Sequence, residues 1–325
     1  MNAELALLGA TLTASLCVGC AGVFRAPRDA PIPALPVAPV TSRRFGALTV
    51  HVAVCGWVRV KSSHRALVGP VPTRILEVLL DPRWTEFMPI FVGIVDHPEG
   101  VFLVDAGMTE SSLDPAHYRS DPGTAFVYGN LLDFRFEPEQ RIDRRLASLG
   151  VAPGRVRGVI LTHRHSDHAD GVEVLPDRAE VYVGRGDFPT HNGALPTQWP
   201  GGRSPTLVGV DGPPIERFAH HVPLTSDGAV SIVTLPGHSP GHLGLLVRAE
   251  HRSIVFAGDA AFSLEQIQRR QLAGIVERPV EARQTLDALA EEIRAHDTRV
   301  VFAHDPASVA RFAADTRTTL LAHSR

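Results

Sequence analysis

Residues 161–171 read Leu161-Thr-His-Arg-His-Ser-Asp-His-Ala-Asp-Gly171, which places three imidazoles and a carboxylate within six consecutive positions. They come directly after residues 156–160, an apolar run typical of a buried β-strand. On a continuing strand His168 would point away from the other three side chains, and on a helix the four would spread around more than one turn. The stretch therefore predicts a strand that ends near Thr162 and leads into a tight loop around metal.

The side chains of this loop also limit which metals are expected. Neutral imidazoles together with carboxylates favour zinc, iron, manganese or cobalt over calcium and magnesium. Two histidines separated by one residue, His163 and His165, can share one ion, which leaves Asp167 and His168 for a second ion. Cys55 is the only cysteine beyond the N-terminal 20 residues, so a cysteine-based metal site is excluded for the main domain.

Four other apolar stretches end in a residue that can bind metal. The residues that follow these stretches are Asp105, His238, Asp259 and His304. Strand ends gathered at one edge of a sheet are where α/β proteins place their chemistry. The helical spacing of apolar residues predicts the helices that separate the strands, at 137–149, at 279–295 and from residue 306 onward. Residues 57–90, which contain four prolines, and residues 184–224, which are rich in glycine and proline, are expected to be irregular.

The N-terminal region differs from the rest of the chain. Residues 5–24 carry no charged side chain, and five prolines lie between residues 27 and 39. This pattern predicts a signal peptide or a membrane or lipid anchor at 1–24, a proline-rich linker at 25–45 and one domain at 46–325.

Three fates of the N-terminal segment stay open. Val18-Gly19-Cys20 resembles the end of a bacterial lipoprotein signal, in which Cys20 would carry the lipid. The segment is also long enough to span a bilayer as an uncleaved helix, or it is a signal that is removed. In each case we expect an exported or envelope-associated protein, which is periplasmic, lipid-anchored or secreted.

The composition and net charge of the chain limit which classes of binding partner are expected. The chain has 325 residues, 44% of them hydrophobic and 21% charged, as in an ordinary globular protein. Its formal net charge of −3 lacks the basic excess of a nucleic-acid-binding protein. We therefore expect a small-molecule substrate and no nucleic acid, with membrane association only through the N-terminal segment. The oligomeric state does not follow from the sequence.

From about residue 46 to about residue 315 the sequence resembles the metallo-β-lactamase superfamily. The His-x-His-x-Asp-His motif at 163–168 carries the resemblance, together with Pro-Gly-His238, Gly-Asp259 and Ala-His304 in that order. The resemblance implies an α/β protein with a four-layer αββα sandwich and a dinuclear metal site at one edge.

The resemblance also implies which residues hold the two divalent ions, most often zinc in this superfamily. His163, His165 and His238 would bind the first ion, and Asp167, His168 and His304 the second. Asp259 would bridge the ions, and Asp167 would also shuttle a proton during catalysis. Asp105 would accept a hydrogen bond from a ligand imidazole, and His242 would pack beneath the site.

The same resemblance indicates which reactions of the superfamily are expected. Asp259 stands where β-lactam-hydrolysing members usually have cysteine or serine, and residues 236–247 look closest to N-acyl homoserine lactonases. A metal-bridging hydroxide would then attack an ester-like carbonyl, and the expected substrate is a lactone. Those lactonases typically have a tyrosine where this chain has Phe262, so a different hydrogen-bond donor or a different substrate is implied. Aromatic residues near the site are candidates for the pocket wall: Trp84, Phe87, Trp199 and Phe262.

Three alternatives stay open. One is a thioester hydrolase of the glyoxalase II type. Another is an oxidoreductase similar to mono-iron persulfide dioxygenases, which share much of the motif. The third is a non-catalytic metal-binding protein of the cell envelope, against which the complete ligand set argues.

Overall fold

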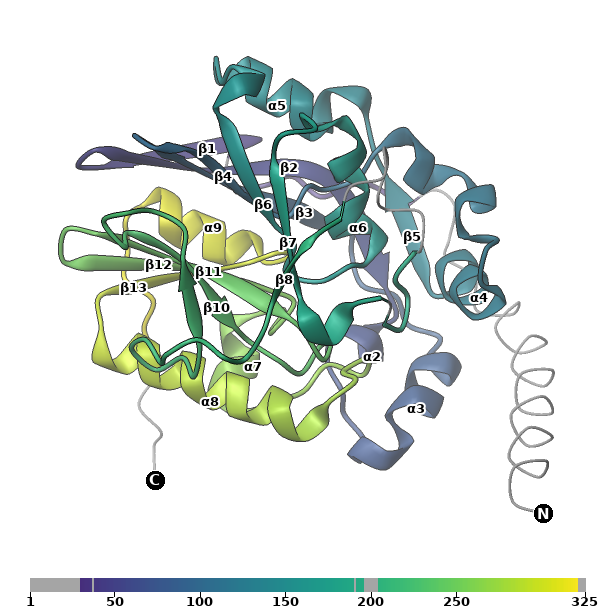
Figure 1. Cartoon of the computed structure of the whole chain (residues 1–325). Helices are drawn as coiled ribbons and strands as arrows, with labels where there is room; N and C mark the ends of the chain where they lie inside the picture. Colours follow the sequence, from purple (N-terminus) through teal and green to yellow (C-terminus); the bar gives the residue numbers. More distant parts are fainter. Residues whose placement is uncertain (1–29, 37, 190, 196–203, 321–325) are drawn as a thin grey trace.

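Two β-sheets pack face to face, with helices on their outer sides (Figure 1). The computed structural model describes residues 30–36, 38–189, 191–195 and 204–320. The first sheet has the strand order β1-β2-β3-β4-β6-β7-β8, with β5 paired to β2. Its strands are β1 (Val40–Phe45), β2 (Leu48–Val60), β3 (Met88–His97), β4 (Gly100–Val104), β5 (Leu132–Arg135), β6 (Val156–Ile160), β7 (Glu180–Gly184) and β8 (Thr206–Val208).

The second sheet has the order β13-β12-β11-β10-β9. Its strands are β9 (His221–Pro223), β10 (Val230–Thr234), β11 (Leu243–Ala249), β12 (Arg252–Gly258) and β13 (Thr298–Phe302). β12 and β13 run parallel, as do β4, β6 and β7 in the first sheet. Parallel neighbours end at the same edge, so the residues that follow them are brought together.

Strand β4 shows how the sequence produces the layers. Successive side chains of a strand point to opposite faces. Phe102 and Val104 accordingly lie in the core between the two sheets, whereas Val101 and Leu103 lie in the core beneath the outer helices of the first sheet. Because both faces are covered, the strand is apolar throughout instead of alternating with polar residues.

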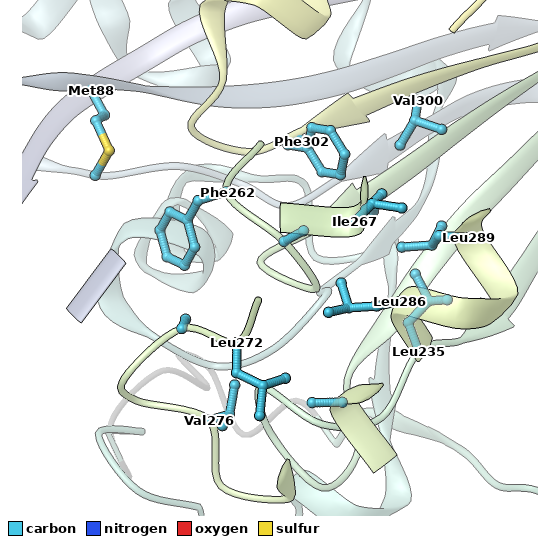
Figure 2. Close-up of a cluster of buried hydrophobic side chains, with 14 of the residues drawn as sticks. Met88, Leu235, Phe262, Ile267, Leu272, Val276, Leu286, Leu289, Val300 and Phe302 are labelled. Carbon is cyan, nitrogen blue, oxygen red and sulfur yellow. The ribbon is translucent and has the colours of Figure 1, made fainter. Parts of the chain in front are cut away.

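The outer layers are amphipathic helices. Helix α5 (Ile142–Ser148) buries Ile142 and Leu146 against the first sheet. Helix α8 (Pro279–Ala295) has the bounds that the sequence predicts and covers the second sheet. Figure 2 shows its Leu286 and Leu289 among side chains of the sheet and of the loop that carries Phe262. The predicted mixed α/β sandwich is confirmed, with the order helix, sheet, sheet, helix.

Three predictions about irregular regions are wrong in part. Residues 40–45, assigned to the linker, form β1 and pair with β2 from Val40 opposite Ala53 to Phe45 opposite Leu48. The region 57–90 continues β2 and contains α2 (Ser62–Arg65) and α3 (Arg74–Leu80). Pro70 and Pro72 suggested irregular chain, but they lie at the start of a 3-10 turn (Val71–Thr73) that leads into α3, and proline is compatible with the start of a helical turn. The region 184–224 likewise contains the short strands β8 and β9.

The remaining structural expectations concern the chain ends. The last predicted helix is α9 (Pro306–Ala313). The signal or anchor proposed for residues 1–24 lies outside the described residues. Within the described ranges, no helix combines the length and apolar character that a membrane crossing requires.

Candidate metal centre

The candidate ligands lie where four strand ends converge. β6 ends at Ile160, and the chain turns through Thr162 into the single-turn helix α6 (Ser166–Ala169). His238 follows β10, Asp259 follows β12 directly, and His304 follows β13. Since the side chains come from both sheets, the centre exists only when the two sheets pack on one another.

Three imidazoles converge to form the first set of candidate ligand atoms. The Nε2 atom of His163 lies 2.8 Å from Nδ1 of His165, and Nε2 of His238 lies 3.2 Å and 3.3 Å from these two atoms. The other nitrogen of His165, Nε2, donates to the carbonyl oxygen of Asn192 at 3.0 Å. That hydrogen bond fixes the proton on Nε2 and leaves the Nδ1 lone pair facing the other two rings.

A second set lies beside the first. Oδ2 of Asp167 is 3.5 Å from Nε2 of His168 and 3.5 Å from Nε2 of His304. Asp259 lies between the sets, because its Oδ1 is 3.3 Å from Nε2 of His304 whereas its Oδ2 is 3.7 Å from Nε2 of His238. All seven side chains that the sequence singled out as metal ligands are therefore brought together.

The buried atoms of this cluster fit a bound cation. Nε2 of His168 and Oδ1 of Asp259 are buried and have no hydrogen-bond partner among the described residues. Buried polar atoms without partners are costly, so their presence at the centre of a ligand cluster indicates that something else satisfies them. Imidazole and carboxylate are the ligand types preferred by zinc and its neighbours in the first transition series.

The pKa values of the histidines differ between the two sets of candidate ligands. Burial holds the pKa of His163 and of His238 well below the ordinary histidine value, and it lowers the pKa of His165 to about 4. These rings are therefore neutral near pH 7, as metal binding requires. Around His168, burial is outweighed by Asp167, Asp105 and Asp259, which raise its pKa to about 10. The same three carboxylates would attract a metal cation.

Asp105 ties the metal loop to the end of β4. Its Oδ2 accepts from Nδ1 of His168 at 2.8 Å and from Oγ1 of Thr162 at 3.0 Å, and its Oδ1 accepts from the Thr162 backbone N–H at 2.7 Å. Asp105 has φ +64°, a left-handed conformation that costs energy for a residue with a Cβ. Gly258 (φ +50°) lets the end of β12 approach this loop, because a Cβ there would lie 2.7 Å from Cβ of Thr162.

His242 lies under the site and outside both ligand sets. Its ring stacks on the His163 ring with 5.4 Å between centroids, and its Nε2 accepts from the backbone N–H of Asp259 at 3.2 Å. Burial lowers its pKa to about 3, so the ring is neutral and can act as this acceptor. It thereby helps to orient Asp259.

Two buried residues that sequence reasoning missed support the loops of the site. Asp187 accepts from Oγ of Ser239 at 2.7 Å and from the Gly241 backbone N–H at 2.6 Å, so it holds the loop that carries His238. Arg164 lies inside the metal motif itself and donates to the carbonyl oxygens of Asp187 and Leu195. Neither residue has a signal in the sequence, since their partners come from distant loops.

The aromatic candidates have different surroundings. The Phe262 ring stacks on the His304 ring with 5.6 Å between centroids, and Phe87 lines a cleft of about 570 Å³ that reaches His304. Trp84 instead lies under the ammonium group of Lys61, 4.3 Å from its ring centroid. Trp199 lies outside the described residues. Phe262 is thus the candidate that contacts a metal-ligand side chain, whereas Phe87 only shares a cleft with His304.

With this geometry established, comparisons with known proteins define the family. The family model of the metallo-beta-lactamase superfamily matches residues 85–304, so the chain belongs to that superfamily. Among curated relatives, the N-acyl homoserine lactonase AttM of Rhizobium radiobacter is 27% identical over 233 residues, which cover 69% of this chain and 85% of the relative. A probable metallo-hydrolase of Mycobacterium tuberculosis is 29% identical over 233 residues, covering 66% and 73% of the two chains.

Solved structures show the same fold. An N-acyl homoserine lactone hydrolase with the product N-hexanoyl-L-homoserine at its catalytic metal center superimposes with a TM-score of 0.62 at 20% identity, covering 82% of this chain and 94% of the other. The dizinc quorum-quenching lactonase AidC gives 0.54 at 15% identity, with 82% and 90% covered. Membership of this superfamily, together with the cluster of candidate metal ligands, identifies the chain as a metallo-hydrolase.

Proposed function

We propose that this protein is a two-metal hydrolase that opens an ester-like bond, and that its substrate is a lactone. The observation that carries the proposal is the position of Asp259, whose two carboxylate oxygens face separate ligand sets. When two divalent ions about 3.5–4 Å apart are bound, such a centre activates water near neutral pH and polarises the carbonyl oxygen of the substrate. Zinc is the proposed metal, because the donor set suits it and AidC is a dizinc enzyme.

The side chains around the metal centre would then position the ions, carry a proton and bind the substrate. Asp259 and His242 fix the spacing between the two ligand sets, because His242 orients the backbone of Asp259. Asp167 is 5% exposed and is the proposed carrier of the proton that the leaving oxygen needs. The cleft beside His304 has the size of a small-molecule site and is lined by Phe87, Met88 and Arg65, among others.

Lactones are favoured over thioesters by the named relatives. AttM of Rhizobium radiobacter and AiiA of Bacillus thuringiensis subsp. kurstaki are both N-acyl homoserine lactonases, and they are 27% and 28% identical to this chain. The fold neighbours include N-acyl homoserine lactone hydrolases as well. We further propose that residues 1–24 direct the enzyme out of the cytoplasm, which the mass and cellular fraction of the mature protein would test.

A hydrolysis panel on the purified full-length protein tests the assignment. It contains acyl homoserine lactones, aliphatic lactones, S-lactoylglutathione and a chromogenic β-lactam, and it is paired with metal analysis. We expect turnover of lactones by protein that holds two ions per chain, and none after chelation. Preferential turnover of S-lactoylglutathione would replace the lactonase assignment by a thioesterase one. A single iron with oxygen uptake would contradict hydrolysis altogether.

A further inference from the structure

His165 is the most exposed of the seven candidate metal ligands. The other six are buried, with at most 6% of their surface exposed, whereas His165 is only partly buried. A ring that is open to solvent on one side is held less firmly by packing, so its orientation depends more on hydrogen bonds. The hydrogen bond that fixes this ring runs from its Nε2 to the carbonyl oxygen of Asn192. The contacts that hold Asn192 therefore decide how well the first ligand set is formed.

The short segment that carries Asn192 lies directly against the His165 ring. Gly193 follows Asn192, and a Cβ at this position would lie 3.0 Å from both Cδ2 and Nε2 of His165. Any other residue would therefore crowd the ring. The carbonyl oxygen of Gly193 accepts from the hydroxyl of Tyr128 at 3.2 Å, which ties the segment to helix α4 (Pro122–Asn130). The backbone of the segment is thus placed to bring the Asn192 carbonyl to His165.

Glu277 holds this segment with both oxygens of its carboxylate. Its Oε1 accepts from Nδ1 of His191 at 3.1 Å, and its Oε2 accepts from the side-chain amide of Asn192 at 3.0 Å. In the neutral His191 ring the proton lies on Nδ1, because Nε2 accepts from the backbone N–H of Arg164 at 3.1 Å. Since Arg164 and His165 are adjacent, the carboxylate is connected to the metal loop through two separate paths of hydrogen bonds.

The main chain of Glu277 contacts the loop that carries His238, another ligand of the first set. Its backbone N–H donates to the carbonyl oxygen of His238 at 3.1 Å. Thr285 of helix α8 supports the same loop, because its Oγ1 donates to the carbonyl oxygen of Pro236 at 2.7 Å. Among the described residues, no hydrogen bond of Glu277 reaches a side chain of the second set. Glu277 thus joins the segments that position two of the three imidazoles of the first set.

We propose that Glu277 is a positioning residue for the first metal ion, because it fixes the His165 ring through Asn192 and the His238 loop through its own backbone. The proposal rests on the two-metal function proposed above, since it requires an ion at the first set. Groups that orient metal ligands contribute about 10–100-fold to metal affinity. Loss of the Glu277 carboxylate should therefore weaken the ion of the first set and spare that of the second. A residue that only stabilised the fold would weaken both ions alike.

The test compares the full-length variants E277A and E277Q with wild type and with E291Q, which changes an exposed glutamate of α8. Zinc-loaded protein is titrated with a chelator, and the ring ¹⁵N signals of His165 and of His304 report zinc loss from the first and second sets. Tm is measured in parallel. For E277A we expect zinc affinity at the first set to fall by about 10–100-fold, with little change at the second. E277Q should lose less, because its amide oxygen can accept from one of the two donors, and E291Q should match wild type.

The outcomes separate this role from general stability and from the proposed function. Equal weakening of both sets in E277A, together with a lowered Tm, would overturn the proposal, as would unchanged affinity at the first set. If E277A does not fold, E277Q decides, and wild-type affinity at its first set overturns the proposal. Wild-type protein that binds zinc at neither set overturns the two-metal function as well. Wild-type protein with two ions and an unaffected E277A overturns only the role of Glu277.

Discussion

Asp105 and His168 form a buried hydrogen bond of 2.8 Å between Oδ2 and Nδ1, and this bond joins the first sheet to the metal loop. In a neutral His168 ring, which metal binding requires, this bond places the proton on Nδ1, so that Nε2 is the atom that faces Asp167 and Asp259. The backbone of Asp105 is held at φ +64° to make this contact. The strain is thus located where it orients a ligand.

Replacing Asp105 by asparagine should weaken metal binding without unfolding the protein. Asparagine tolerates the left-handed conformation and can still accept from Thr162, but it removes the charge beside His168. We expect metal affinity to fall by about 10–100-fold, measured by competition with a chelator. D105A, which cannot accept from His168, should lose more. Wild-type affinity in D105N would show that the carboxylate does not support the site.

Replacing His165 by alanine should abolish zinc binding at the first set and activity together. His165 places its Nδ1 at 2.8 Å from Nε2 of His163, and the hydrogen bond to Asn192 fixes its ring, so its removal takes one of three ligand atoms from the first set. Metal analysis and lactone turnover on the same preparation measure both effects. His251 is exposed and lies in the turn between β11 and β12, which makes H251A the matched control. Activity retained in H165A would mean that the motif does not bind the catalytic metal.

Asp81 should make stability depend on pH in acid. Burial alone would raise its pKa, but hydrogen bonds from Arg83 and Ser63 outweigh burial and lower the pKa to about 2. Because the pKa of Asp81 in the folded protein lies below the ordinary aspartate value of 3.8, this stabilisation is complete above about pH 4 and is lost as pH falls towards about 2.

The D81N variant isolates this contribution. Its free energy of unfolding should be lower than that of wild type by about 2 kcal/mol near pH 7, and the difference should vanish near pH 2. Urea unfolding at several pH values measures it. The exposed Asp211 provides the control, since D211N should follow wild type throughout. A difference between D81N and wild type that persists unchanged to about pH 2 would contradict the assignment.

Leu289 tests the packing of α8 on the second sheet. It is fully buried between the helix and the sheet (Figure 2), and its truncation to alanine should cost about 2–5 kcal/mol of unfolding free energy. Val280 lies on the same helix but is 68% exposed, so V280A should change stability by less than about 0.5 kcal/mol. Denaturant unfolding measures both variants. Equal effects would show that α8 does not pack as described.

The metal ligands were predictable because their signal is local. Four of the seven lie within six positions of the chain, and each of the other three comes within four residues after an apolar strand. Helix α8 was predictable for the same reason, since its apolar residues recur with helical spacing from Pro279 to Ala295. Strand β1 and helices α2 and α3 were missed, because nearby prolines suggested irregular chain.

What the sequence determined by itself is therefore the chemistry of the centre: imidazoles and carboxylates that suit two ions, delivered by strand ends. Only the tertiary structure decided which side chains support and border it. Asp187 holds the His238 loop, and Gln266 joins Phe262 to the α2 segment. Each of these roles depends on a contact between distant segments. Such contacts form when the two sheets pack together, and no periodic pattern in the chain records them.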